Sequence, residues 1–326
     1  MSAQATSVRG LFSRYGVRLL RTYGVVLALV LVVILVASQS SAFLTWTNIT
    51  NLSGQWAAAG IIAVGMTYVI ICGGLDLSVG ASFSFCAITA AQVAQTTAPE
   101  VAFLAAIGVG LVIGTINGMV VTLLKVNSLI ATLGTGLILA GLGLVWTDNA
   151  PIPVTDEGFA RLGQEVAGIP YSGILLVLFL VVGGIVLART VYGQWVYATG
   201  GNLEAASLTG LPTRLVTAST YAFTGVCAGV AGVIAASQLG AAQADFDPDL
   251  LFDVITIVVL GGTSLTGGFG AMWRTAVGIA IIATLDNGFN LLNLDPNFQD
   301  IFKGAILIGA LALDSYAQRL ARAREG

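Results

Sequence analysis

The sequence contains no histidine, and its only lysines are Lys125 and Lys303. Histidine is the commonest general base and metal ligand, so metal-assisted hydrolysis and Ser-His catalysis are disfavoured. Neither lysine follows the glycines of a G-x-x-x-x-G-K-[ST] phosphate loop, so ATP hydrolysis by this chain is disfavoured as well. We expect a protein that is not an enzyme, with no catalytic residues, no metal site and no bound cofactor.

Charge is also scarce. Charged residues make up 9% of the 326 residues and the net charge is −3, whereas soluble domains carry roughly 25% charged residues. Hydrophobic residues reach 56%, and the mean hydropathy is +0.93. A soluble enzyme is nearly excluded, and so small a net charge gives no reason to expect a nucleic-acid partner.

Cysteine is rare too, and Cys72, Cys86 and Cys227 all lie in apolar stretches. None of them has the C-x-x-C or C-x-x-H spacing of a redox or zinc motif. We interpret all three as packing residues.

The apolar residues occur in repeated runs of about 17–25, the length that an α-helix needs to cross a bilayer. We therefore predict an all-α, polytopic helical bundle of about ten membrane spans. The predicted spans are 23–40, 52–72, 79–97, 101–123, 128–147, 171–188, 215–237, 250–266, 275–292 and 298–314.

Residues 1–22 are predicted to precede this bundle as an interfacial segment. Arg14, Arg18 and Arg21 share one helical stripe and Leu11 lies on another, which is typical of a helix lying on the membrane surface. A signal peptide ending near Ser38 is the alternative. The long basic region favours the interfacial helix.

The distribution of positive charge predicts the orientation. With both termini in the cytoplasm, only Arg161 and Lys303 of the 13 Lys and Arg residues fall at or near the outside. The predicted domains are the interfacial segment 1–22, a permease domain 23–314 with an inner loop at 189–214, and a basic cytoplasmic tail at 315–326.

One segment, 73–80, breaks the membrane pattern. It reads GGLDLSVG, with three glycines around Asp76. Glycine weakens a helix by about 1 kcal/mol, and an aspartate near the bilayer centre costs about 2.5–3.5 kcal/mol. Such a break at membrane depth requires burial in protein or a water-filled path. A pathway-lining re-entrant segment and a plain cytoplasmic turn both remain open.

Two weak echoes suggest internal repeats, as in many transporters. The pair Gly73-Gly74 recurs as Gly261-Gly262, followed again by a leucine, a hydroxyl residue and a glycine. Asn117-Gly118 likewise recurs as Asn287-Gly288. The offsets differ between the two echoes, so any duplication is imperfect.

The inner loop contains a short helix with its own start and stop signals. Asn202 is a good N-cap, Glu204 lies in the first turn, and Gly210 and Pro212 end the helix. A helix of about two turns is marginal in isolation. We expect it to pack on a partner protein or on the membrane surface.

Four segments together closely resemble the ribose-type permease subunits of ATP-binding-cassette sugar importers. They are GGLDLSVG at 73–80, ATLGT at 131–135, GGN at 200–202 and VLGGTSL at 259–265. In addition, Glu204–Pro212 looks like the EAA-x3-G loop through which importer permeases dock on their ATPase. The similarity runs from about residue 20 to the end of the chain.

The resemblance implies a permease in the bacterial inner membrane that imports a ribose-like pentose or a related sugar or polyol. Its implied partners are an ABC ATPase that binds ATP and Mg, an extracytoplasmic sugar-binding protein, a second permease copy or paralogue, and lipid. The alternative is an ion-coupled secondary transporter that uses Asp76 or Asp286.

Candidate site residues fall into two groups. The candidate translocation path consists of Gly73, Gly74, Asp76, Ser78, Asn117, Thr263 and Ser264. The candidate ATPase-coupling residues are Asn202, Glu204, Ala205, Ala206, Gly210 and Pro212.

Overall fold

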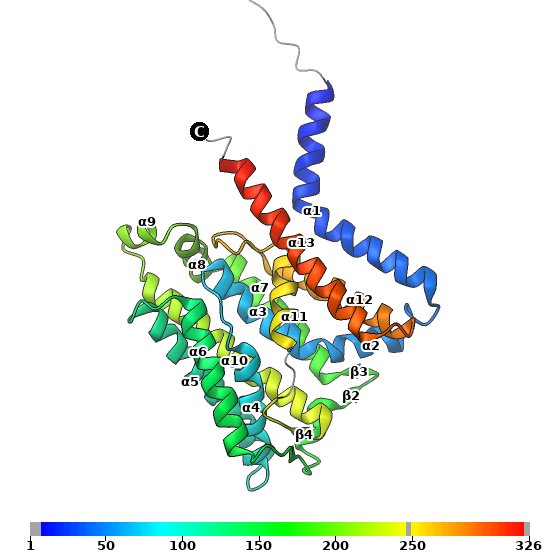
Figure 1. Ribbon diagram of the computed structural model, residues 1–326, viewed down its shortest axis with the longest axis vertical. Helices are drawn as coiled ribbons and strands as arrows, with labels where there is room; N and C mark the ends of the chain where they lie inside the picture. Colours follow the sequence, from blue (N-terminus) through cyan, green and yellow to red (C-terminus); the bar gives the residue numbers. More distant parts are fainter. Residues whose placement is uncertain (1–7, 246–248, 323–326) are drawn as a thin grey trace, which may run out of the picture.

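The computed structural model describes residues 8–245 and 249–322, and within these ranges it is built almost entirely of helices (Figure 1). The predicted segments 1–22 and 315–326 lie partly outside the described residues. The elements are α1 (Val8–Gln39), α2 (Trp46–Gln55), α3 (Ala57–Ile71), α4 (Val79–Ala94), α5 (Pro99–Thr122), α6 (Ser128–Trp146), β1 (Ile152–Pro153), η1 (Phe159–Gly163), β2 (Glu165–Val166), β3 (Ile169–Pro170), α7 (Tyr171–Arg189), α8 (Val191–Gly201), α9 (Leu203–Leu208), α10 (Thr213–Leu239), β4 (Ala241–Ala242), α11 (Leu250–Leu260), α12 (Met272–Leu291) and α13 (Pro296–Arg322).

Among the residues that the structure describes, four helices are long and apolar enough to cross a membrane, namely α5, α6, α7 and α10. A fifth candidate is the bent pair α2 and α3. All five coincide with predicted spans, so a polytopic helical protein is confirmed. The count of about ten spans and the cytoplasmic placement of both termini stay predictions.

The helix bounds add two details to the sequence prediction. Residues 8–39 form one helix, α1, and the division into an interfacial segment 1–22 and a first span stays a prediction. The predicted span 52–72 is broken by a bend of 54° between α2 and α3. The bend follows Gly54, where an added Cβ would lie 3.0 Å from Pro170. Bare backbone at this position lets β3 pack against the break.

The loop between α6 and α7 contains short strands that an all-α prediction omits. β1 pairs with β4 after α10, with Ile152 opposite Ala242, and β2 pairs with β3 as a small hairpin. The β1–β4 pair ties the α6–α7 loop to the end of α10. Each strand has only two residues, which is too short for an alternating sequence pattern to reveal it.

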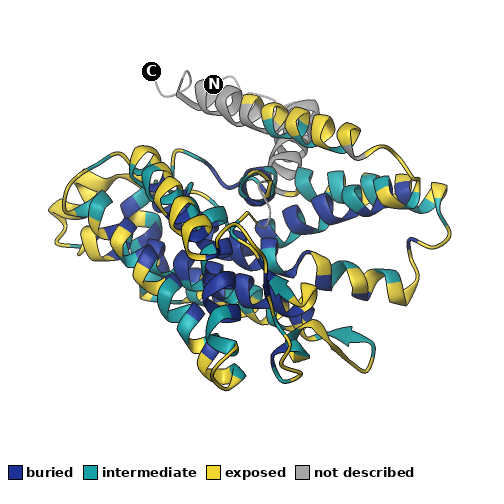
Figure 2. Cartoon of the chain, turned by 60° about the horizontal axis from the view of Figure 1, so that its bottom comes forward, coloured by how far each residue is buried: buried dark blue, intermediate teal, exposed yellow. Residues whose placement is uncertain are grey.

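The core surrounds α3 and α10. Almost every residue of α3 is buried, whereas α6 and α7 expose long apolar side chains, as Figure 2 shows by the yellow on the outer helices. Cys72, Cys86 and Cys227 are all buried, which confirms them as packing residues. Apolar exposure on the outside and dense packing within fit helices surrounded by lipid.

Glycines bring α5 and α10 into backbone contact. A Cβ on Gly110 would overlap the Gly225 carbonyl oxygen, and one on Gly114 would overlap the Tyr221 carbonyl oxygen. Small residues at intervals of four are how membrane helices approach closely, since lipid provides no hydrophobic drive for association.

Candidate translocation path and coupling loop

The break between α3 and α4 is held by a defined turn and by a buried carboxylate. Gly73 has φ +88°, and Gly74 N donates to Val69 O at 2.9 Å, which closes α3 in a left-handed cap. Asp76 is only 2% exposed. Its Oδ1 accepts hydrogen bonds from Ser78 N at 2.9 Å and Ser78 Oγ at 2.6 Å. The aspartate therefore lies inside the protein, away from lipid.

A chain of polar side chains links this break to α5 and α6. Asn117 Nδ2 donates to Ser78 Oγ at 2.8 Å, and Thr135 Oγ1 donates to Asn117 Oδ1 at 2.7 Å. Thr132 Oγ1 accepts from Leu77 N at 2.9 Å. The structure thus brings together Asp76, Ser78 and Asn117. It adds Thr132 and Thr135, which the ATLGT motif had indicated only as part of the resemblance.

Thr263 and Ser264 belong to a second loop, after α11. Gly262 has φ +88°, like Gly73, and Gly262 N donates to Val259 O at 2.8 Å. By backbone geometry Gly73 therefore corresponds to Gly262. The repeat suggested by the sequence pairs Gly73 with Gly261, so the two pairings differ by one residue. Thr263 and Ser264 are buried, and Ser264 Oγ pairs with Thr266 Oγ1 at 3.0 Å.

Three glycine segments, which we call the glycine junction, bring the two loops into contact with the inner loop. Gly268 N donates to Ile71 O at 2.8 Å. A Cβ on Gly267 would lie 2.7 Å from Gly200 O and 3.0 Å from Gly73 Cα. The junction is Gly73, Gly200 and Gly267–Gly268. Here α3, α8 and the loop after α11 meet backbone to backbone.

The capped helix in the inner loop is α9. Asn202 Oδ1 accepts from Ala205 N at 2.9 Å, which confirms the N-cap. Gly210 has φ +83° and Leu211 N donates to Ala206 O at 3.2 Å, so the helix ends as predicted. Pro212 follows at once. The start and stop signals read from the sequence are confirmed.

The expected partner surface of α9 needs one correction. Ala206 is buried at 6% exposure, because this face of α9 packs on α8 and α10. Leu203 and Leu208 are 59% and 83% exposed, and Glu204 and Ala205 are exposed as well. Any partner would therefore meet the leucines and not Ala206.

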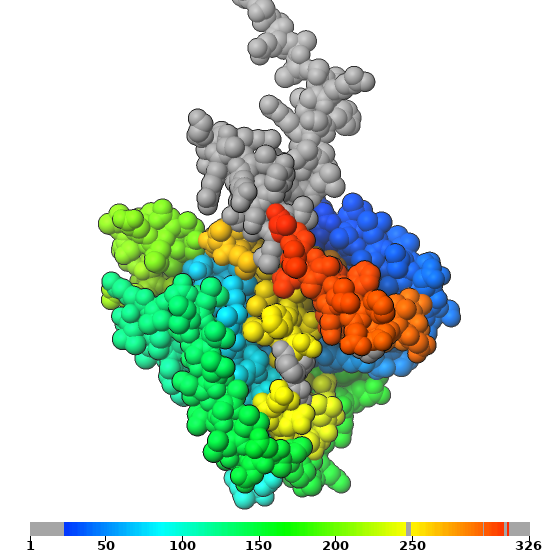
Figure 3. Space-filling model, viewed as in Figure 1, coloured from blue at the N-terminus to red at the C-terminus, as the bar shows by residue number. Residues whose placement is uncertain are grey.

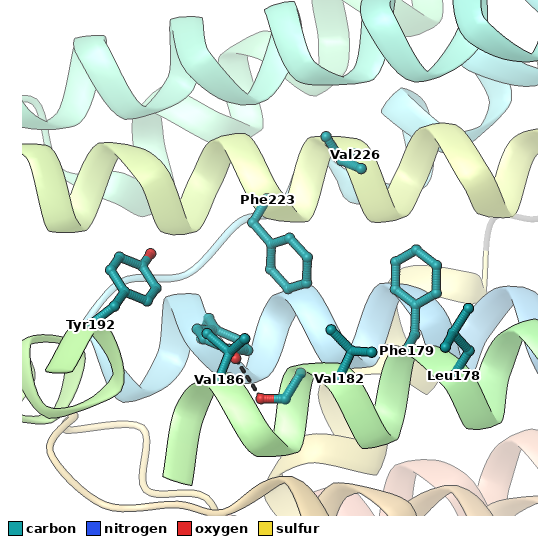
Figure 4. A pocket seen from close by; sticks show the side chains of 9 residues that line it. Leu178, Phe179, Val182, Val186, Tyr192, Phe223 and Val226 are labelled. Atoms are coloured by element: carbon teal, nitrogen blue, oxygen red, sulfur yellow. Dashed lines mark hydrogen bonds between the residues drawn. The ribbon is translucent and has the colours of Figure 1, made fainter. Parts of the chain in front are cut away.

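Two cavities of similar size differ in chemistry. One, of about 470 Å³, lies between α3, α7 and α10 and is lined by apolar side chains together with Tyr68 and Tyr192 (Figure 4). Tyr68 OH donates to Gly183 O, and Tyr192 OH pairs with Ser219 Oγ. With its polar atoms already bonded, this cavity does not suit a hydrophilic solute.

The other cavity, of about 390 Å³, lies where the ends of α3, α10 and α11 meet α12 and α13. We call it the polar cavity. It is lined by Gln55, Trp56, Ala58, Ala59, Phe83, Ala235, Gln238, Leu239, Asp249, Leu250, Asp253, Asp286 and Lys303. Sequence reasoning singled out Asp286 only as an ion-coupling candidate, because these residues are far apart in the chain. No group of three metal-ligating side chains occurs among the residues that the structure describes.

Comparison with known proteins identifies the family. Residues 48–311 match the family model described as branched-chain amino acid transport system / permease component. The ribose import permease protein RbsC of Bacillus subtilis is 39% identical over 295 residues, covering 89% of this chain and 92% of that protein.

RbsC of Escherichia coli K12 is 34% identical, over 90% of this chain and 93% of that protein. The L-arabinose transport system permease protein AraH of the same strain is 33% identical, over 92% of each chain. No solved structure matches the chain. The protein therefore belongs to the permease-component family of transport systems that includes the ribose and arabinose permeases of bacteria.

Proposed function

We propose that this chain is the membrane-spanning permease subunit of an ATP-driven importer for a monosaccharide. The expected substrate is a ribose-like pentose or a related sugar or polyol, and the expected location is the bacterial inner membrane. The observation that carries the proposal is the similarity, over 89% and 92% of this chain, to permeases named for ribose and L-arabinose. Although the family description names branched-chain amino acids, these relatives make a sugar the better choice.

The proposed partners follow from what the chain lacks and exposes. No phosphate loop is present in the sequence, so a separate ABC ATPase must bind ATP and Mg. Its proposed docking site is α9, where Leu203 and Leu208 are exposed beside a capped helix end. An extracytoplasmic sugar-binding protein would deliver the substrate, and a second permease copy or a paralogue would complete the pathway.

For the path itself we propose the polar chain at the α3–α4 break. Asp76, Ser78 and Asn117 join α4, α5 and α6 by short hydrogen bonds. Gly73 and Gly74 shape the break, while Thr263 and Ser264 stand on the second glycine loop. Non-helical backbone at membrane depth is tolerated where it is buried in protein or lines a water-filled cavity. The break thus offers a polar route through an otherwise apolar bundle.

Ion-coupled secondary transport is the competing function. Asp286 favours it, since an acid on a predicted span is a typical ion site. However, Asp286 already accepts a hydrogen bond from Gln299 and lies near Lys303. Asp76 is likewise held by Ser78. Both carboxylates thus have hydrogen-bond partners within the protein and do not require a bound ion. In addition, an ion-coupled transporter would give the capped helix α9 no role.

Uptake measurements decide between the two functions. The chain is expressed in a bacterium that lacks its own ribose permease but keeps the ribose-binding protein and ATPase, and radiolabelled ribose and L-arabinose are supplied. Uptake should survive a protonophore and vanish when the ATPase subunit carries an inactivated nucleotide site. Uptake that persists without ATPase activity and stops with the protonophore would overturn the proposal in favour of ion coupling.

A further inference from the structure

The polar cavity contains the kind of side chains that recognise a polyhydroxylated ligand. Carboxylates and amides surround one indole ring, and the volume of about 390 Å³ lies at the lower end of the roughly 300–1,000 Å³ range of small-molecule sites. At about 30 Å³ per water molecule it would hold roughly a dozen waters. A single monosaccharide is of this scale.

The bend between α2 and α3 puts the aromatic residue in place. Trp56 lies at the break and is only 7% exposed. Lys303 Nζ lies 5.7 Å from its ring centroid, and Asp286 lines the same cavity. The ring thus has charged side chains close to it. A rigid apolar face next to charged groups suits a sugar, which presents C–H bonds on one face and hydroxyls around its edge.

The polar groups are ordered by one another. Lys303 Nζ lies 3.0 Å from Asp253 Oδ1 and 3.1 Å from Asp253 Oδ2. Gln238 Nε2 donates to Gly54 O at 3.1 Å and to Ser172 Oγ at 3.0 Å. Side chains held in this way are preorganised, which lowers the entropy lost when a ligand binds.

Charge narrows the class of ligand. Three aspartates and one lysine line the cavity, and the lysine is already paired with Asp253. An anionic group would meet a net negative charge, because three carboxylates outnumber one lysine, so sugar phosphates and the carboxylate of an amino acid fit poorly. A neutral polyol can donate its hydroxyls to the carboxylates and accept from the lysine.

The cavity also has a definite place along the bundle. α10 begins beside α9 and ends at Leu239 in the cavity, and α3 runs from Trp56 in the cavity to the glycine junction. The end of α10 that lines the polar cavity is thus the end away from α9, and Figure 1 shows α9 and β4, which follows α10, far apart. Figure 3 shows α11 (yellow) at the surface beside α13 (orange to red).

We propose that the polar cavity binds one neutral monosaccharide or polyol, with Trp56 as the stacking surface and Asp253, Asp286 and Lys303 as hydroxyl partners. Resting on the proposed function, this makes the cavity the first site that a sugar occupies in the permease, on the side away from the ATPase.

Equilibrium binding to the purified full-length chain in lipid nanodiscs tests the site without any transport step. Saturation-transfer NMR with D-ribose and L-arabinose should give signals from the sugar protons. Asp286→Asn should weaken the signal by about tenfold or more, the loss expected when a hydrogen bond to a charged group is removed. Ala58→Phe should abolish it by filling the cavity.

The apolar cavity provides the matched control. Val226→Phe fills that cavity and should leave sugar binding unchanged, and size-exclusion profiles show whether each variant is folded. Sugar signals that survive both Ala58→Phe and Asp286→Asn would overturn the site. L-leucine and choline are tested in the same way. If either binds more tightly than both sugars and Ala58→Phe removes that binding, the proposal is also overturned, because the site would then suit an amino acid or a cation.

The two proposals fail separately. If ATP-driven uptake is present but the purified chain gives no sugar signal, the cavity site is wrong and the importer assignment stands. If ribose binds and Ala58→Phe removes the binding, yet uptake does not require the ATPase, the importer assignment is wrong and the cavity site stands.

Discussion

Asn48 and Asn287 exchange two hydrogen bonds across the bundle. Asn48 Nδ2 donates to Asn287 Oδ1 at 2.8 Å, and Asn287 Nδ2 returns a bond to Asn48 Oδ1 at 3.0 Å. The pair joins α2 to α12. The sequence pairs Asn287-Gly288 with Asn117-Gly118, but the two asparagines have different partners. Asn287 bonds to Asn48, whereas Asn117 bonds to Ser78 and Thr135.

Replacing either asparagine leaves the other amide without its partner. We expect Asn287→Leu to lower the free energy of unfolding by about 0.6–1.7 kcal/mol, the scale of polar contacts between membrane helices. Asn48→Leu with Asn287→Leu should lose less than the sum of the two single losses. Thermal unfolding of the four proteins in detergent measures this coupling, and strictly additive losses would show that the pair contributes nothing as a pair.

The α5–α10 contact predicts opposite effects for two glycines on one helix. A Cβ on Gly108 meets nothing within 4 Å, whereas one on Gly110 would overlap the Gly225 carbonyl. Gly108→Ala should be neutral or stabilise by up to about 1 kcal/mol through helix propensity. Gly110→Ala should destabilise by about 1–3 kcal/mol through overpacking. Equal unfolding temperatures for the two variants would contradict the close packing.

Asp76 is predicted to matter for transport more than for folding. In Asp76→Asn an oxygen remains to accept from Ser78, so insertion should stay normal. Uptake should fall by about tenfold, since a hydrogen bond from a passing solute to a neutral amide is weaker than one to a carboxylate by about 1–1.5 kcal/mol. Membrane content is followed by immunoblotting and transport by initial uptake rates. Unchanged uptake would make the break a plain turn.

Leu208 is the residue through which to test docking on α9. Leu208→Arg should weaken co-purification of the ATPase by about tenfold, because exposed apolar anchors dominate such contacts. Leu124→Arg is the charge-matched control, as Leu124 is 70% exposed in the turn between α5 and α6. Ala206→Arg would test the folding of α9 instead, since Ala206 is buried. Normal ATPase binding by Leu208→Arg would exclude α9 as the docking helix.

The orientation can be tested by cysteine labelling after Cys72, Cys86 and Cys227 are replaced. Gly201 and Glu157 are suitable positions because both are exposed and a Cβ on Gly201 meets nothing within 4 Å. Gly200 is unsuitable, since its Cβ would overlap the Ile71 carbonyl. In intact cells an impermeant maleimide should label Glu157→Cys only. Labelling of Gly201→Cys from outside would reverse the topology.

Local signals in the sequence sufficed for much of the fold. Apolar runs located α5, α6, α7 and α10 to within two residues at each end, because lipid imposes length and composition on each span separately. The caps of α9 were readable for the same reason, since a cap depends on neighbours a few residues away.

The bend at Trp56 and the polar cavity were not readable. The sequence changes from polar TNITNLSGQ at 47–55 to apolar residues at 57–71, but such a change marks the start of a straight span as well as it marks a bend. Asp253 and Lys303 are fifty positions apart, and their pairing depends on how α11 packs against α13. Likewise, the sequence marks Gly200 as a loop glycine, whereas its actual constraint comes from Ile71 and Gly268.

A contact made only of main chain cannot adjust by changing rotamers. At the glycine junction, Gly200 and Gly267 present no side chain that could swing aside when one segment moves. A shift of α8 by a fraction of an ångström must therefore be shared by the end of α3 or be blocked by it. The backbone at this point is therefore closely fitted, and Gly73 lies in the same turn as Asp76.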